Sequence, residues 1–351
     1  MAPRAGRPAA DGTGVDVYLA GTVFLDLVFT GLEGPPRPGT ECHATGLGPS
    51  PGGVATVAVA LARLGLRVRL AALFGDDISG DYLWRVLAET EGVDLSACRR
   101  VPGWSTPVTV SLADQQDRSM VTHSAAPPVA APAGERLPPG ARGCFTYLGA
   151  EPAPWLERAR DRGVVVFADV GWDPSGDWPQ AHLEWLGPGD VFLPNEVEAM
   201  AYTRTRTARA ALGRLLERVS TAVVKRGGRG ALAAERGGPV LAEPALAVEA
   251  TDPTGAGDVF DAAFIYGTLA GWPLAHRLRF AVLCSGLSVR HPGGAMSAPR
   301  WAEIAAFHAR ARAGGEARRW AFLTDLLAAR PPERRPAELP AGRRFAGSPS
   351  R

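Results

Sequence analysis

The chain has 351 residues, of which 46% are apolar and 21% charged, and its formal net charge is +2. This length and composition allow a sizeable hydrophobic core and exclude a disordered chain. The small net charge provides no overall field for nucleic acid or anionic lipid, so neither partner is predicted. The one lysine, Lys225, is followed by Arg226 instead of serine or threonine, which excludes a Walker-type phosphate loop.

Residues 1–14 form a tail without an apolar signal core, and no apolar run is long enough to cross a membrane. The four cysteines form no CxxC pair, and no two histidines have metal-ligand spacing. Free thiols are typical of a reducing compartment, so we expect a cytoplasmic protein.

Apolar β-rich runs alternate with helical patterns along most of the chain. We predict, in chain order, a strand at 15–20, a helix at 54–64, a strand at 68–74, a helix at 80–91, a strand at 144–148, a helix at 155–162, strands at 164–170 and 191–193, a helix at 208–219, a strand at 222–225, and helices at 257–270 and 274–289. Near-continuous apolar strands are covered on both faces. This order predicts a three-layer, doubly wound α/β sheet with right-handed crossovers.

Two segments interrupt this alternation. Residues 22–45 and 107–123 have short alternating β patterns with glycine and proline between them, and we expect them to leave the main sheet as a small β lid. Residues 331–351 are rich in proline and arginine, which predicts a disordered tail. The predicted domain therefore spans 15–330, between two tails.

The most informative segment for chemistry is the run DPTGAGDVF at 252–260, after a strand-like stretch at 247–250 and before an apolar helix. A turn of small residues that enters a helix directs backbone N–H groups and the helix dipole toward a phosphate. Gly255, Ala256 and Gly257 would form this anion site, and Asp258 could accept a proton from a substrate hydroxyl. In the alternative, Asp252 or Thr254 only caps the helix.

This nine-residue run resembles the C-terminal signature of the ribokinase-like family, the carbohydrate kinases of the phosphofructokinase B type. The resemblance implies a ribokinase-like fold that uses ATP. It also implies that Asp258 is the catalytic base, that the backbone of 255–257 is the anion hole and that Thr254 lies beside ATP.

The N-terminal part of the chain has further similarity to the family. Pro51, Gly52 and Gly53 precede the alanine-rich helix, as in the family's N-terminal signature, where the glycines lie against the sugar. Asp26 matches an aspartate at the end of the first strand that binds sugar hydroxyls, and Thr56 stands at another sugar-binding position. Alternatively, Asp26 is a turn residue and the glycine pair is a tight turn before the helix.

Two motifs imply nucleotide and metal contacts. Asn195 and Glu198 are similar to the family's NxxE motif, which organises Mg²⁺ through water near the phosphates. Lys225, Gly227 and Gly230 resemble the nucleotide loop after a late strand. Alternatively, Asn195 and Glu198 cap the following helix and Lys225 is a solvent-exposed strand residue. The resemblance covers about 15–310.

The departures from the family concern the substrate. Val54 stands where ribokinases have a lysine, and Thr56 stands where much of the family has an asparagine. Without the lysine and the asparagine, the site lacks two groups that bind sugar hydroxyls. The preferred sugar should therefore differ, and a substrate other than free ribose is expected. The adenine contacts near 293–295 stay unassigned.

The motifs together predict an ATP- and Mg²⁺-dependent kinase that phosphorylates a hydroxyl of a sugar or sugar derivative. A nucleoside kinase of the same family and a non-catalytic sugar or nucleotide sensor are the alternatives. No GxGxxG follows the first strand, which excludes a dinucleotide-binding dehydrogenase. The exposed edges of a small lid favour a homodimer through lid contacts.

Overall fold

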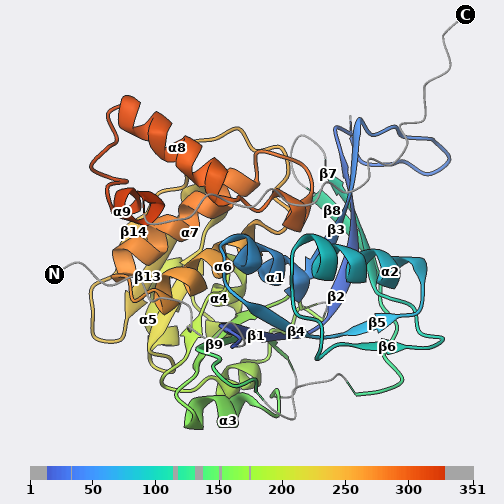
Figure 1. Ribbon diagram of the computed structural model, residues 1–351, viewed down its shortest axis with the longest axis horizontal. Coiled ribbons are helices and arrows are strands. Elements are labelled where there is room, and N and C mark those ends of the chain that lie inside the picture. The colour runs from blue at the N-terminus through green and yellow to red at the C-terminus, as the bar shows by residue number, and fades with distance from the viewer. Residues whose placement is uncertain are drawn as a thin grey trace, which may run out of the picture.

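The computed structural model describes residues 14–32, 34–113, 118–130, 137–149, 152–173 and 175–328. The predicted tail at 331–351, and that at 1–14 except its last residue, lie outside these ranges. The main sheet has eight strands in the order β14-β13-β12-β11-β10-β9-β1-β4 (Figure 1). These are β1 (Val17–Ala20), β4 (Val68–Ala71), β9 (Gly143–Leu148), β10 (Val165–Val170), β11 (Val191–Phe192), β12 (Thr221–Lys225), β13 (Ala231–Glu235) and β14 (Leu241–Glu243).

Strands β4, β1, β9, β10, β11 and β12 run parallel, whereas β13 and β14 are antiparallel additions at one edge. After β1 the chain adds β4 on one side and then β9 to β12 on the other, so the strand order reverses beside β1. The predicted doubly wound α/β sheet is confirmed. In such sheets, ligands bind beyond the carboxyl ends of the strands at the point of reversal.

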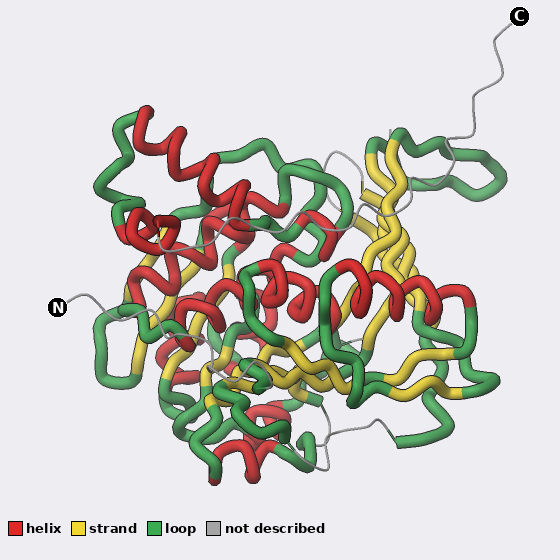
Figure 2. Tube along the Cα trace, viewed as in Figure 1, coloured by secondary structure: helices red, strands yellow, loops and turns green. Residues whose placement is uncertain are grey.

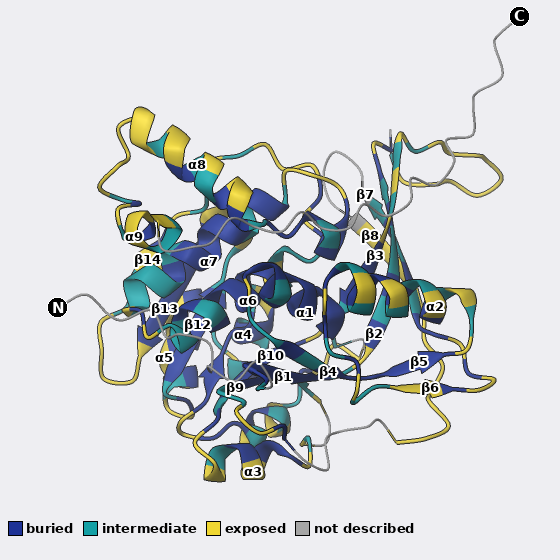
Figure 3. Ribbon diagram, viewed as in Figure 1, coloured by how far each residue is buried: buried dark blue, intermediate teal, exposed yellow. Residues whose placement is uncertain are grey.

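The strands are buried on both faces because successive side chains point in opposite directions. Val17 and Leu19 belong to the same core as α1, α6 and α7, whereas Tyr18 and Ala20 pack with α3. Helices therefore cover the sheet on two sides (Figure 2), and the buried residues concentrate between the layers (Figure 3). One layer contains α1 (Val54–Arg63), α6 (Ala256–Leu269), α7 (Leu274–Ser288), α8 (Trp301–Ala313) and α9 (Phe322–Ala328), and the other contains α3 (Leu156–Asp161), α4 (Glu196–Thr203) and α5 (Ala208–Leu216). No helix in the described ranges has the length and hydrophobicity to cross a bilayer.

A second sheet of four strands stands at one end of the molecule, on the right in Figure 1. Its order is β3-β2-β7-β8, with β2 (Val23–Thr30), β3 (Gly46–Gly53), β7 (Val108–Ala113) and β8 (Arg118–His123). Beside it lie a short parallel pair, β5 (Leu73–Gly75) and β6 (Arg99–Val101), and α2 (Ile78–Arg85), which ends in a π-helical turn at Val86–Thr90. The segments at 22–45 and 107–123, predicted to form a lid, supply β2, β7 and β8.

The structure corrects three details of the predicted elements. Gly46–Gly53 is strand β3, although its glycines and prolines favoured a turn, because an edge strand tolerates proline. Asp26 lies inside β2 and not at the end of the first strand, because the chain leaves the main sheet near Gly21. The strand-like stretch at 247–250 is irregular, because β14 already ends the sheet on that side.

Candidate active site

The residues predicted to bind phosphate and to act as the base lie at the carboxyl edge of the parallel strands. Tyr147 and Asp169 are the second-last residues of β9 and β10, and Lys225 is the last residue of β12. Helix α6 begins opposite these ends, and its first turn carries Asp258. Doubly wound sheets bind ligands at this edge, and a helix N-terminus there favours negative charge.

Helix α6 begins at a left-handed glycine. Gly255 (φ 73°) is the N-cap, and as a glycine it provides no side-chain cap for the helix. Asp252 instead accepts the N–H of Thr254 at 2.9 Å and that of Gly293 at 3.0 Å. The alternative in which Asp252 or Thr254 caps the helix is therefore wrong, and the helix dipole stays available to an anion.

The start of α6 has close neighbours on two sides. A Cβ added to Gly255 would lie 3.0 Å from Cγ2 of Thr56, and one added to Gly257 would lie 3.5 Å from Nζ of Lys225. The Ala256 N–H already donates to the carbonyl three residues earlier, at 3.2 Å. Of the three residues predicted to form the anion hole, Ala256 therefore has its amide engaged within the turn.

Asp258 is held by a tyrosine that the sequence did not single out. The hydroxyl of Tyr147 donates a hydrogen bond to Oδ1 of Asp258. Burial raises the pKa of Tyr147, and the negative charge of Asp258 raises it further. Tyr147 therefore keeps its proton and acts as a donor to the carboxylate.

Lys225 lies in a cluster of buried carboxyl groups. Its Nζ is 2.7 Å from Oδ2 of Asp169 and 3.0 Å from both oxygens of Asp261, and its side chain is only 11% exposed. Burial alone would favour the neutral amine, but the two carboxylates raise the pKa of Lys225 well above its ordinary value. Burial and the charge of Asp169 raise the pKa of Asp261, although Lys225 opposes this. The alternative in which Lys225 is solvent-exposed is wrong.

Asn195 and Glu198 form a capping box at the start of α4. Oδ1 of Asn195 accepts the Glu198 N–H at 3.0 Å, and Oε2 of Glu198 accepts the Asn195 N–H at 2.9 Å. The capping alternative is therefore confirmed. Burial raises the pKa of Glu198 to about 8, and the neighbouring Asp169 contributes to this increase.

Asn195 and Glu198 would provide Mg²⁺ with few protein ligands. Within the described part of the chain, no three His, Cys, Asp or Glu side chains cluster as a metal-binding group. Mg²⁺ prefers one or two carboxylates together with water and phosphate oxygens, so a single buried carboxyl fits this pattern. A cation beside Glu198 would also favour the ionised carboxylate that burial disfavours.

The residues predicted to bind the sugar lie where the four-stranded sheet meets α1. A Cβ added to Gly52 would overlap the carboxylate of Asp26, so that carboxylate lies directly against the glycine backbone. Gly53 (φ 60°) joins β3 to α1, which a residue with a side chain would do only under strain. The buried Thr56 donates its hydroxyl to the carbonyl of Pro51 at 3.2 Å. Asp26 thus lies inside a strand, and the alternative in which it is a turn residue is wrong.

The four-stranded sheet also touches the turn before α6. Oγ of Ser111, on β7, lies 3.5 Å from Oγ1 of Thr254. Because Thr56 contacts the neighbouring Gly255, the residues predicted for the sugar and for the anion meet at one place.

Gly227 and Gly230 belong to a short 3-10 turn between β12 and β13. Gly230 (φ 80°) is pressed against the backbone that follows β14, whereas a Cβ on Gly227 would meet open space. Lys225 connects this turn to the carboxyl cluster, since it is the last residue of β12.

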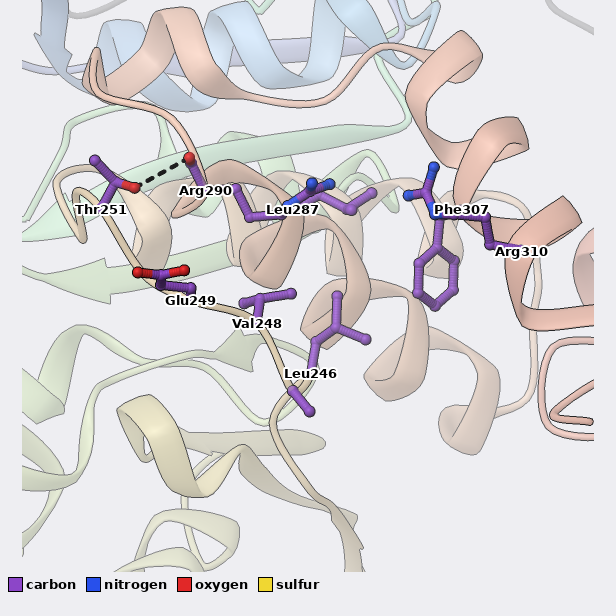
Figure 4. Close-up of a pocket in the computed structure, with 9 residues that line it drawn as sticks. Leu246, Val248, Glu249, Thr251, Leu287, Arg290, Phe307 and Arg310 are labelled. Carbon is purple, nitrogen blue, oxygen red and sulfur yellow. Dashed lines mark hydrogen bonds between the residues drawn. The ribbon is translucent and has the colours of Figure 1, made fainter. Parts of the chain in front are cut away.

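A cavity of about 470 Å³ is lined on one side by residues 246–251, the segment that leads into the turn before α6 (Figure 4). The lining residues come from this segment, from α7 and the turn after it, and from α8; they are Leu246, Ala247, Val248, Glu249, Thr251, Leu287, Arg290, Phe307 and Arg310. None of the residues predicted to bind substrate, nucleotide or metal lines this cavity.

Sequence reasoning missed Tyr147, Asp169 and Asp261. Tyr147 and Asp169 are the second-last residues of two predicted strands, so they were polar groups at the carboxyl edge where ligands bind. Asp261 follows Asp258 by three positions, and it is an ionisable residue within a buried helix. Both signals were visible in the sequence, but neither identifies a partner.

The model of the pfkB family carbohydrate kinases matches residues 20–135 and 153–301. An uncharacterised sugar kinase of Escherichia coli, YeiI, is 29% identical over 297 residues, which cover 77% of each chain. The ATP-dependent ribose-1-phosphate kinase of Halopiger xanaduensis is 31% identical over 261 residues, which cover 73% of this chain and 85% of its own. The ribokinase of Schizosaccharomyces pombe is 25% identical over 314 residues, covering 83% and 96%.

Solved structures share the fold. Arabidopsis thaliana ribokinase, solved with ribose and ATP, has a TM-score of 0.67 at 21% identity, with 84% of this chain and 98% of that chain covered. A neighbour from E. coli was solved with ATP and Mg²⁺ and has a TM-score of 0.69 at 22% identity, with 84% and 99% covered.

Proposed function

This chain belongs to the pfkB family of carbohydrate kinases, and from that premise we propose that it transfers the γ-phosphoryl group of ATP to a hydroxyl of a sugar or sugar derivative. One observation carries the proposal. Asp258 stands in the first turn of a helix whose N-terminus has no side-chain cap among the described residues, at the carboxyl edge of a doubly wound sheet. A base and an anion site are thereby adjacent, as phosphoryl transfer requires.

In the proposed reaction, Asp258 accepts the proton of the acceptor hydroxyl. The acceptor oxygen then bonds to the γ-phosphorus, the bond from that phosphorus to the β,γ-bridging oxygen breaks, and ADP leaves. The amides of Gly255 and Gly257 and the helix dipole stabilise the negative charge on the transferred group. Lys225 adds positive charge beside Gly257, since its ammonium lies close to that residue.

We assign the metal to the Asn195 and Glu198 side of the site. Mg²⁺, when bound with ATP, neutralises phosphate charge. Both residues would hold the metal through water, because the capping box already engages Oδ1 of Asn195 and Oε2 of Glu198. The nucleotide extends along the turn at 227–230, with Thr254 beside the phosphates.

The sugar lies between Asp26, the glycine pair and Thr56. Asp26 accepts hydrogen bonds from sugar hydroxyls, and Gly52 and Gly53 let the ring approach the backbone. Thr56 has its hydroxyl engaged with a backbone carbonyl and Val54 is apolar, so this site lacks two groups that would bind free ribose. The substrate is therefore a different sugar, a sugar phosphate or a sugar acid.

The test is a panel of sugars, sugar phosphates, sugar acids and nucleosides with ATP and Mg²⁺, read as ADP release. Asp258→Asn keeps the shape of the side chain but removes the proton acceptor, so kcat should fall by about 10²–10⁴. Asp81→Asn, at an exposed position on α2, is the matched control and should leave kcat unchanged. A D258N enzyme that keeps half of the wild-type kcat would contradict the base assignment, and binding without turnover would favour a sensor.

A further inference from the structure

Tyr147 is fixed in place where the strand order of the sheet reverses. It lies on β9, next to β1, and its ring meets that of Phe145 edge to face at 5.2 Å. From this position its hydroxyl donates to Oδ1 of Asp258. The donor therefore belongs to the rigid sheet, whereas the acceptor belongs to the first turn of a helix.

The charged groups around Asp258 explain why a neutral hydrogen-bond donor, the Tyr147 hydroxyl, would help to keep this carboxyl group ionised. Charged groups from four elements surround Tyr147 and Asp258: Asp169 on β10, Glu198 on α4, Lys225 on β12 and Asp261 on α6. Three of these four groups are acids, and each of them, when ionised, favours the protonated form of a neighbouring carboxyl group. A base must be ionised to accept a proton. A hydrogen bond donated to the ionised form favours that form without adding charge.

We propose that Tyr147 is a positioning residue for Asp258, and that its hydroxyl both orients the carboxylate toward the acceptor hydroxyl and keeps it ionised. This inference rests on the proposed function, since it assigns a role to Tyr147 only through the base. The raised pKa of Tyr147 supports it, because the phenol remains a donor across the pH range of the assay.

Tyr147→Phe removes the hydroxyl and keeps the ring. Charge-assisted hydrogen bonds are strong enough that kcat should fall about 10- to 100-fold, whereas KM for sugar and ATP should stay within about twofold. The acid limb of the rate–pH profile should move to higher pH, by about one unit. Tyr202→Phe is the matched control, because it also removes one hydroxyl hydrogen bond, to His182, on the opposite side of the sheet. It should change neither kcat nor the profile.

The double variant separates positioning from a general structural effect. If Tyr147 acts only through Asp258, then Y147F should lower kcat much less in a D258N background than in the wild type. A kcat for Y147F within twofold of wild type, an unmoved acid limb, or equal losses in both backgrounds would overturn the inference. If no acceptor in the panel is phosphorylated, the proposed function fails instead. An active wild type with an unaffected Y147F variant contradicts only the role of Tyr147.

Discussion

Replacing Glu198 by glutamine should stabilise the metal-free protein, and the gain should grow with pH. Glu198 is 7% exposed, and burial raises its pKa from 4.5 to about 8. An acid with a raised pKa stabilises the folded state below pH 4.5, and this contribution is lost as the pH rises through about 8. Each pKa unit corresponds to about 1.4 kcal/mol, so the wild type should lose about 3–4 kcal/mol relative to E198Q between pH 5 and pH 8. Above pH 9 the difference should be constant.

The assay is urea unfolding in EDTA-containing buffer at pH 5, 6, 7, 8 and 9. Glutamine can still accept the Asn195 N–H, so the variant should retain the capping box. Glu196→Gln is the matched control, because Glu196 stands in the same helical turn but pairs with the exposed Arg229. It should show no such pH trend. A difference between E198Q and wild type that does not grow from pH 5 to pH 8 would refute the argument.

Glu198→Gln should also raise the Mg²⁺ concentration for half-maximal rate about tenfold, as loss of a supporting metal contact does, while E196Q should not. An unchanged requirement would leave Glu198 with the capping role alone. Asp26→Ala should raise KM for the sugar about tenfold or more, through loss of a charged hydrogen-bond acceptor. Free ribose should have a lower kcat/KM than the best of fructose, ketohexose phosphates, sugar acids and adenosine, and ribose as the best substrate would contradict the reading of Val54 and Thr56. Light scattering at tens of micromolar should show a homodimer, because Leu47, Met120 and Val121 are exposed on the four-stranded sheet, and a monomer would exclude pairing through that sheet.

The start of α6 was predictable because its signals are local. Glycines, small residues and a following apolar helix lie within nine positions, and a left-handed glycine such as Gly255 is a usual device at such a turn. The main sheet was predictable for a similar reason, since its central strands are continuous apolar runs.

The carboxyl cluster could not be predicted because its members are distant in sequence. Asp169 and Asp261 come within 3.0 Å of Lys225 only after β10, β12 and α6 have packed together. Strand β3 was missed because its glycines and prolines disfavour strands. Its full-length pairing with β2, together with its position at the sheet edge, outweighs that local preference.

The burial of Lys225 has a consequence for protein chemistry. This residue provides the only ε-amino group of the chain, and that group is held as an ammonium ion between Asp169 and Asp261. Acylating reagents attack the neutral, accessible amine, so an activated ester should label the native protein only at its α-amino group. Lys225 should become reactive when the chain unfolds. The mass gained by acylation therefore counts unfolded molecules directly, with a single lysine as the reporter.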